Sequence, residues 1–229
     1  EGDFREFAPN DSLFDKQSHH KIINSDKAWA HDLGKEEVIV AVTDDGFRLD
    51  HEDLKTSWHI NTKEIPGNNI DDDSNGYIDD VKGWDFNEGD NNPGSDERNG
   101  NHGTHVAGTI AAGFDNGIGV TGISPMIKVM PLKFYGENRW TSAMVYETYR
   151  YAVDNGAKVV STSYNIDFFV NDEVYKKALN YMYKNKVIFL NSVGNAGRKN
   201  PPRVAFENVL LVGSTTSGRS TLDRKSRFS

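Results

Sequence analysis

The sequence predicts an α/β protein with a doubly wound, mostly parallel sheet. Two observations lead to this fold class. Short apolar runs rich in Val, Ile and Leu recur along the 229-residue chain, and segments with apolar residues at helical spacing stand between them. Buried strands that alternate with helices are typical of a parallel sheet covered on both faces. In such a sheet, functional residues gather at the carboxyl ends of the strands.

The elements follow in order along the chain. Short apolar runs of this kind predict buried strands, and they occupy 37–46, 127–134, 157–163, 186–194 and 209–214. Helical spacing of apolar residues predicts helices over 142–156 and 171–185. Gly156 is the expected end of the first helix, and Asn171 is the expected N-cap of the second.

The composition limits the class of protein. With 36% hydrophobic residues, residues 1–229 suffice for a single globular domain. No run approaches the roughly 18 apolar residues of a membrane span, so none is expected. The chain begins at Glu1 without a basic and apolar leader, so any leader is expected to be already absent. The chain holds no cysteine, which excludes disulfides, thiolate zinc sites and a cysteine nucleophile.

The net charge of −8 is concentrated in one segment. Residues 71–96 hold nine acids and a single base, Lys82, whereas the rest of the chain has 25 acids and 25 bases. Such a focused acidic segment suggests a cation site rather than a generally acidic surface. Nucleic acid is not an expected partner, because its phosphates require a basic surface.

The acidic segment contains DDDSNGYIDD, which resembles the first half of an EF-hand loop. Lys82 stands where an EF-hand has its bidentate Glu, which excludes a true EF-hand. Oxygen ligands on alternate residues around a glycine still suit Ca²⁺, so a calcium site is predicted here, with a solvated acidic loop as the alternative. The predicted ligands are Asp71, Asp73, Asn75 and Asp79.

Residues 99–112, NGNHGTHVAGTIAA, place two histidines at the head of a run of small residues. Three interpretations compete. His102 and His105 could bind a metal, but the HExxH pattern is missing and the spacing places no third ligand nearby. The segment could simply begin a packed helix. Alternatively, His102 is a general base, and Gly103 lets another part of the chain approach closely.

Asp44 and Asp45 end the first predicted strand, just before Gly46. Asp-Gly is a common turn dipeptide, so a turn is one interpretation of this pair. An acid at the carboxyl end of a strand also lies at the functional edge of the sheet. Asp44 before His102, on an α/β scaffold, follows the Asp, His, Ser order of one class of serine protease.

Three separated segments carry a family resemblance. VAVTDDGFRLDHEDL, HGTHVAGTIAA and SVGNAG resemble the aspartate, histidine and oxyanion-asparagine segments of the subtilisin-like serine proteases, the subtilases. The resemblance extends over about residues 11–229. It implies a serine endopeptidase acting on protein or peptide substrates, with Asp44 as catalytic acid, His102 as base and Asn195 as oxyanion-hole donor.

The main departure from the family concerns the nucleophile. The subtilase serine motif, G-T-S-x-A, is nowhere in the chain. The final segment LDRKSRFS resembles the piece that precedes that motif, so Ser229 is not the nucleophile. The resemblance therefore implies a domain that is incomplete at its C-terminal end. Its remaining part and an inhibitory pro-segment are expected partners, and a non-catalytic peptide-binding module of the same fold is the alternative.

Two departures concern the substrate cleft. Tyr164 and Asn165 replace the usual Leu and Gly of a substrate-binding segment, and on the opposite rim residues 138–140, NRW, replace a typical Gly-Ser-Gly. This bulk could narrow the cleft or stack on substrate, although a packing role is equally expected for Trp140. Asp45 stands where the family usually has Ser or Thr. This replacement does not imply a preference for substrates with basic residues. The implied substrate-binding residues are Ser163, Tyr164, Asn165 and Gly194.

The resemblance implies two further calcium sites. One would use the side chains of Asp11, Asp53 and Asn116 together with three backbone carbonyls, those of Phe114, Ile118 and Val120. The other would use Asp85 and Asp90, with Glu88 as an additional candidate. A calcium-stabilised protease of this kind is expected to be secreted, or to be located in the periplasm or at the cell surface.

Overall fold

The computed structural model describes residues 8–95, 101–138, 140–165, 167–216 and 224–225. Arg139 and Asp96, the last acid of the 71–96 segment, lie outside the described residues. The helices are α1 (Ser18–Ile23), α2 (Ser25–Trp29), α3 (Asn101–Ala111), α4 (Ser142–Asp154) and α5 (Glu173–Lys184). Three short 3-10 helices are η1 (Phe14–Lys16), η2 (Asp167–Phe169) and η3 (Pro202–Ala205).

Six strands form one parallel sheet in the order β2-β3-β1-β4-β5-β6. They are β1 (Ile39–Asp44), β2 (Trp84–Asp85), β3 (Lys128–Lys133), β4 (Val159–Thr162), β5 (Ile188–Ser192) and β6 (Leu210–Val212). The parallel α/β fold that the sequence predicts is thus confirmed, and each predicted strand lies within its predicted bounds. The two-residue strand β2 was not predicted, because it is too short to show a pattern.

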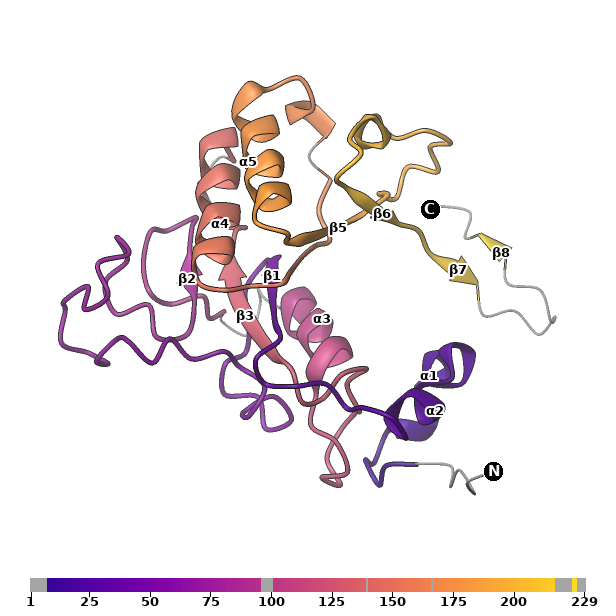
Figure 1. Ribbon diagram of the computed structural model, residues 1–229. Coiled ribbons are helices and arrows are strands. Elements are labelled where there is room, and N and C mark those ends of the chain that lie inside the picture. Colours follow the sequence, from indigo (N-terminus) through magenta and orange to yellow (C-terminus); the bar gives the residue numbers. More distant parts are fainter. Residues whose placement is uncertain (1–7, 96–100, 139, 166, 217–223, 226–229) are drawn as a thin grey trace.

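Helices cover both faces of this sheet (Figure 1). Successive side chains of a strand point to opposite faces, so one strand serves two cores. In β1, Val40 and Val42 pack in the cluster that contains Ala107 of α3, whereas Ala41 packs in the cluster of α4 and α5. This double burial explains why the predicted strands read as continuous apolar runs rather than as alternating ones.

The ends of the two predicted helices follow local chemistry. Gly156 has φ +87° directly after α4, and the backbone N–H of Ala157 bonds back to Ala152, so Gly156 ends the helix as predicted. The N-cap prediction for α5 was wrong by one residue. Asp172, not Asn171, caps the helix, because its carboxylate accepts from the backbone N–H of Val174 at 2.7 Å and from the following residue.

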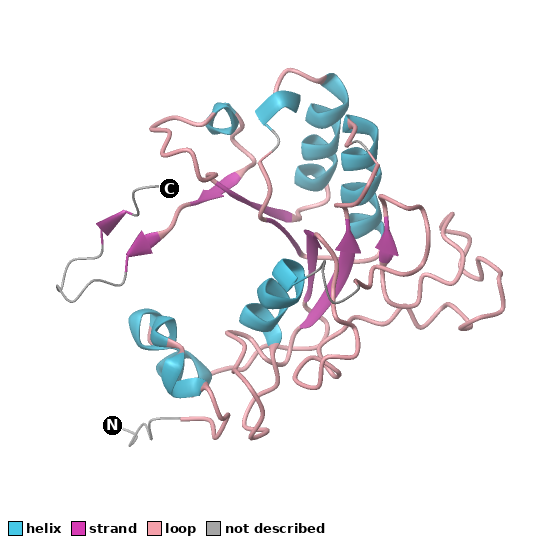
Figure 2. Cartoon of the chain, turned by 180° about the vertical axis from the view of Figure 1, so that it is seen from behind, coloured by secondary structure: helices cyan, strands magenta, loops and turns pink. Residues whose placement is uncertain are grey.

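Several elements lie outside the predicted pattern. Helices α1 and α2 are only 6 and 5 residues long, which is too short to show a helical period. The strands β7 (Thr215–Thr216) and β8 (Arg224–Lys225) pair antiparallel, apart from the main sheet (Figure 2). Among the described residues, no helix is both long and apolar enough to cross a membrane.

Candidate active site

Asp44 and His102 meet at the carboxyl edge of the sheet. Asp44 is the last residue of β1, and His102 lies in the first turn of α3. The His102 Nδ1 atom lies 2.7 Å from Asp44 Oδ1, so the hydrogen bond expected between them is present. Asp44 is buried, whereas the His102 side chain is 60% exposed. The arrangement fixes one ring nitrogen and leaves the other open to a reaction partner.

The neighbours of this pair hold α3 against β1. The Asp45 carboxylate accepts from the backbone N–H of Gly103 at 2.8 Å, which satisfies a free donor of the first helical turn. A Cβ on Gly103 would lie 2.4 Å from the backbone oxygen of Gly46 and 2.9 Å from Asp44 Cβ. Glycine is therefore needed for the close approach that the sequence suggested. Asp45 acts here as a helix cap, a role that sequence reasoning missed.

A small cavity of about 110 Å³ opens beside the pair. It is lined by Asp44, Asp45, His102, Tyr135, Trp140, Ser163 and Tyr164. The Tyr164 ring stacks on Phe134 at 4.8 Å, and its hydroxyl accepts a 2.9 Å bond from Thr43, so this side chain packs inward. Trp140 also contacts Phe134, at 5.0 Å between ring centroids. Trp140 and Tyr164 therefore pack together, with 5.5 Å between ring centroids, as the packing alternative for Trp140 expects.

The remaining predicted residues lie on two neighbouring segments. Ser163 follows β4 and is exposed, and its carbonyl accepts a 3.3 Å bond from the Ser192 hydroxyl at the end of β5. Gly194, with φ +87°, and the exposed Asn195 come directly after β5. Since β4 and β5 are adjacent and parallel, their carboxyl ends bring these two segments side by side.

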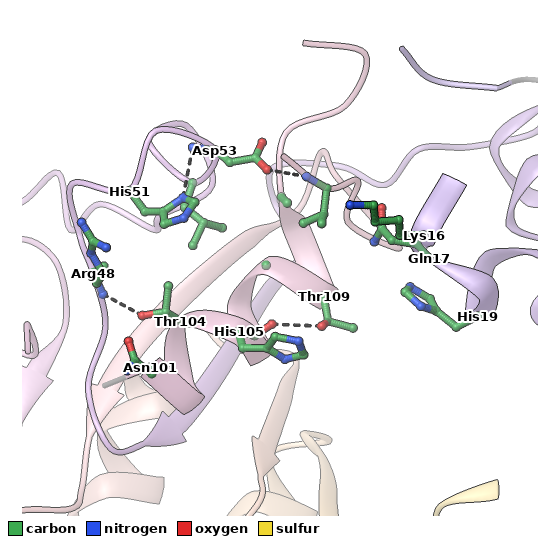
Figure 3. Close-up of a pocket in the computed structure, with 14 residues that line it drawn as sticks. Lys16, Gln17, His19, Arg48, His51, Asp53, Asn101, Thr104, His105 and Thr109 are labelled. Atoms are coloured by element: carbon green, nitrogen blue, oxygen red, sulfur yellow. Dashed lines mark hydrogen bonds between the residues drawn. The ribbon is translucent and has the colours of Figure 1, made fainter. Parts of the chain in front are cut away.

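His105 does not share a site with His102. It projects from α3 into a different and larger cavity of about 600 Å³, which also contains His19 and His51 (Figure 3). Among the described residues, a single group of three metal-binding side chains converges within 4.8 Å, and it contains no histidine. The geometry therefore gives no support to a metal centre built on His102 and His105.

That converging group lies in the acidic segment. Carboxylate oxygens of Glu64, Asp71 and Asp73 all lie within 4.8 Å of one another. Glu64 and the Asp73 side chain are each 5% exposed, and Lys63, which pairs with Asp73 at 3.7 Å, is 72% exposed. Sequence reasoning missed Glu64, because it precedes the motif. The only feature of the sequence that could have indicated Glu64 as a ligand is its position shortly before the acidic segment.

The other two predicted ligands of this segment have different surroundings. The Asp79 carboxylate is engaged by the backbone N–H groups of residues 67–69, at 2.7–3.2 Å. The Asn75 side chain accepts from the backbone N–H of Tyr77 and donates to the fully buried Asp80. Asp79 and Asn75 therefore shape the loop around the three carboxylates.

A second set of predicted ligands also converges. Asp11 and Asp53 are 5% and 3% exposed, and both contact Asn116, through its backbone N–H and its side-chain amide respectively, each at 3.0 Å. Asp53 also accepts from the backbone N–H of Val120 at 2.9 Å. Segments that are distant in sequence thus meet here, around two buried carboxylates.

The third predicted site has its own countercharge. Lys133 Nζ lies 2.6 Å from Asp85 Oδ2, and the Asp85 side chain is 1% exposed. The other Asp85 oxygen accepts from the backbone N–H groups of Asn87 and Glu88. Asp90 pairs with Asp85 through the backbone, with 2.8 Å between Asp85 N and Asp90 O. Lys133 thus already neutralises Asp85, and calcium has less support here than at the other two sets.

Comparison with known proteins places these features in a family. The profile of the subtilase family, peptidase S8, matches residues 35–229. Thermitase from Thermoactinomyces vulgaris is 31% identical over 97% of this chain and 70% of its own length. A halolysin-like extracellular serine protease, Nep, from Natrialba magadii is 29% identical over 68% of this chain and 26% of its own length.

Solved structures agree on the fold. A lanthipeptide protease superimposes with a TM-score of 0.68 at 24% identity, over 98% of this chain and 63% of that protein. The chain thus spans only part of the length of these relatives. The match over most of the chain, together with the identity to thermitase, is decisive. The chain therefore belongs to the subtilase family.

Proposed function

We propose that residues 1–229 form most of the catalytic domain of a calcium-stabilised serine endopeptidase. The observation that carries this proposal is the 2.7 Å contact between His102 Nδ1 and Asp44 at the sheet edge. The nucleophile would be a serine outside these 229 residues, because the subtilase serine motif is not among them. Protein or peptide chains are the proposed substrates.

The proposed chemistry uses each residue in one role. His102 would take the serine proton on its exposed ring nitrogen as the hydroxyl attacks the peptide carbonyl, and would then pass it to the leaving amine. Asp44 would hold the imidazole in the required tautomer and stabilise the imidazolium. Asn195 would donate its side-chain N–H to the developing oxyanion, a contact worth about 10²–10³ in turnover in proteases of this type.

Calcium is proposed at two places. The buried Glu64 and the half-buried Asp71 and Asp73 offer oxygens that converge within 4.8 Å. The exposed Lys63 pairs with Asp73 alone, so the three negative charges would repel one another without a further cation. The second place is formed by Asp11, Asp53 and Asn116, with the carbonyls of Phe114, Ile118 and Val120 as further ligands. A bound cation at the second place would tie together segments that are far apart in the sequence.

The proposed setting is outside the cytoplasm, either secreted, periplasmic or at the cell surface. The name of the relative Nep describes it as extracellular, which supports this assignment by similarity alone. An inhibitory pro-segment and the remaining C-terminal part of the domain are the proposed protein partners.

The function is tested by comparing two polypeptides. Purified residues 1–229 should show no peptide hydrolysis that a serine-directed covalent inhibitor blocks. A longer polypeptide that includes a G-T-S-x-A segment should hydrolyse peptides, and His102→Ala should lower its kcat by about 10⁶-fold. Serine-dependent hydrolysis by the 229 residues alone would contradict the assigned nucleophile. A longer polypeptide that binds peptides without cleaving them would instead favour the non-catalytic module.

A further inference from the structure

Arg203 is the largest fully buried side chain among the described residues, with an exposed fraction of 0%. It lies in the short helix η3. One guanidinium nitrogen, Nη1, donates to Asp167 Oδ1 at 2.6 Å and to the side-chain oxygen of Asn165. The other, Nη2, donates to the backbone oxygen of Ser192 at 2.8 Å. One buried cation therefore contacts three residues from two different segments.

Those segments are the two neighbouring ones that carry the predicted substrate-binding residues and Asn195. Asn165 belongs to the segment after β4, which carries the predicted substrate-binding residues. Ser192 ends β5, three residues before Asn195. A Cβ placed on Gly194 would lie 3.2 Å from Asn165 Nδ2 and 3.9 Å from Arg203 Nη2. The guanidinium thus lies beside the turn that leads to Asn195, and it joins this turn to the segment after β4.

The shape of the arginine side chain fixes the distance between the two segments that Arg203 contacts. A guanidinium is a rigid planar fork with donors at set angles, so it defines the separation of the groups that it binds. Among the described residues, the carboxylate that contacts Arg203 directly is that of Asp167, which also pairs with the exposed Arg198 at 3.3 Å. Tyr149 and Tyr175, from α4 and α5, are also near enough for the Arg203 charge to lower their pKa values, which burial raises. A lysine could keep the charge but not the two-sided geometry.

We propose that Arg203 is a positioning residue for the oxyanion site. It holds the segment after β5 at a fixed distance from the segment after β4, so that Asn195 faces the carbonyl of a peptide bound along Ser163–Asn165. This inference rests on the proposed function. Arg203 itself touches no reacting atom, and its effect passes through Asn195 and Asn165.

The experiment is a double-mutant cycle in the active protease that contains these residues. Arg203→Lys is expected to lower kcat by about 10–100-fold, because a misplacement of about 1 Å costs up to 10²-fold. In the Asn195→Ala background the same change should alter kcat by less than about threefold, since the donor that it positions is gone. Arg150→Met, at a half-exposed arginine paired with Glu147, is the control and should leave kcat unchanged.

The outcomes separate this inference from the proposed function. An unmodified protease without serine-dependent activity overturns both. An unchanged kcat in Arg203→Lys overturns the positioning role alone. An equal loss of kcat with and without the Asn195 side-chain amide also overturns it, because general destabilisation would act equally in both backgrounds. Asp167→Asn is measured in parallel, because it keeps the shape of the carboxylate that pairs with Arg203 and removes its charge. If Arg203→Lys does not fold, Asp167→Asn takes its place in the same double-mutant cycle.

Discussion

At the scale of single residues, Asp44 is held in an unfavourable environment. It is 8% exposed, and among the described residues its Oδ2 atom has no hydrogen-bond partner. Burial raises the pKa of its carboxyl group, and the hydrogen bonds from the Asp45 backbone and from His102 offset this only in part. The folded state therefore holds the Asp44 proton more tightly than the unfolded state. Ionised Asp44 consequently lowers the stability of the fold near neutral pH.

We expect Asp44→Asn to increase the free energy of unfolding at pH 7 by about 1 kcal/mol while it abolishes the proposed activity. Below the ordinary carboxyl pKa of about 3.9 the gain should vanish, because Asp44 is then protonated in both states. It should appear as the pH rises through the raised pKa of the folded state. Urea unfolding between pH 3 and pH 8 measures this.

The matched control is Asp50→Asn, at an exposed aspartate on the loop after β1, which removes the same charge at the surface and should change the free energy of unfolding by less than about 0.5 kcal/mol at pH 7. If Asp44→Asn instead lowered stability equally at all pH values, the hydrogen bond with His102 would outweigh the cost of burying the charge. In that case the interpretation that ionised Asp44 destabilises the fold would be wrong.

Residue roles differed in how far the sequence revealed them. Asp44 and His102 lie in two segments that resemble subtilase motifs, so their contact across 58 positions was predicted from that resemblance, and Gly103 was expected beside His102 for a close approach. Asp45 and Arg203 could not be assigned this way, because their partners are set by tertiary packing. The Gly103 backbone is 58 positions from Asp45, and Asn165 is 38 positions from Arg203.

At the scale of elements, the contact between α3 and β1 sets the catalytic geometry. Gly103 lies tightly against the end of β1 and the turn after it, because a Cβ there would lie 2.4 Å from the backbone oxygen of Gly46, which cannot rotate away. Gly108 lies about one and a half turns further along the same helix, and a Cβ there would meet no atom within 4 Å. These two glycines therefore provide a matched pair for the same substitution.

We expect Gly103→Ala to push α3 away from β1 and to lengthen the contact between Asp44 and His102. The change should lower stability by about 1–3 kcal/mol and kcat/KM of the active protease by about 10²-fold. Gly108→Ala should instead raise stability by about 0.5–1 kcal/mol through helix propensity. Thermal unfolding and peptide hydrolysis measure both variants. Similar effects of the two substitutions would show that the close approach at Gly103 is not critical.

Element predictions succeeded where burial on both sides gave long apolar runs, as in β1 and β3. They missed α1, α2 and β2, which are too short to show a period. The N-cap of α5 was misplaced because Asn171 and Asp172 are both good caps, and only the backbone geometry selects Asp172.

At the scale of the whole molecule, the distribution of charge is the basis of the proposed calcium sites. The acidic segment 71–96 carries the entire net charge of −8, and two of its carboxylates converge with that of Glu64 within 4.8 Å. The sequence indicated the segment and most of its acids. It could not indicate Glu64, because only folding brings that side chain against Asp71 and Asp73.

The last prediction concerns calcium-dependent stability. A cation that binds only the folded state stabilises it by RT ln(1 + [L]/Kd), about 2.7 kcal/mol at a hundredfold excess over Kd. We therefore expect chelation to lower the Tm, and millimolar calcium to restore it. Sodium chloride should not restore it, because simple screening cannot replace oxygen coordination.

Substitutions then locate the effect. Glu64→Gln should reduce the shift in Tm between calcium and chelator, and Asp11→Asn should do so independently, because the two sets of ligands are separate. Glu207→Gln, at an exposed glutamate far along the chain, removes the same charge and should leave the shift intact. An unfolding curve that is identical in calcium and in chelator would show that the converging carboxylates form a solvated loop. The proposal of calcium stabilisation would then lose its support, and the setting outside the cytoplasm would rest on the similarity to Nep.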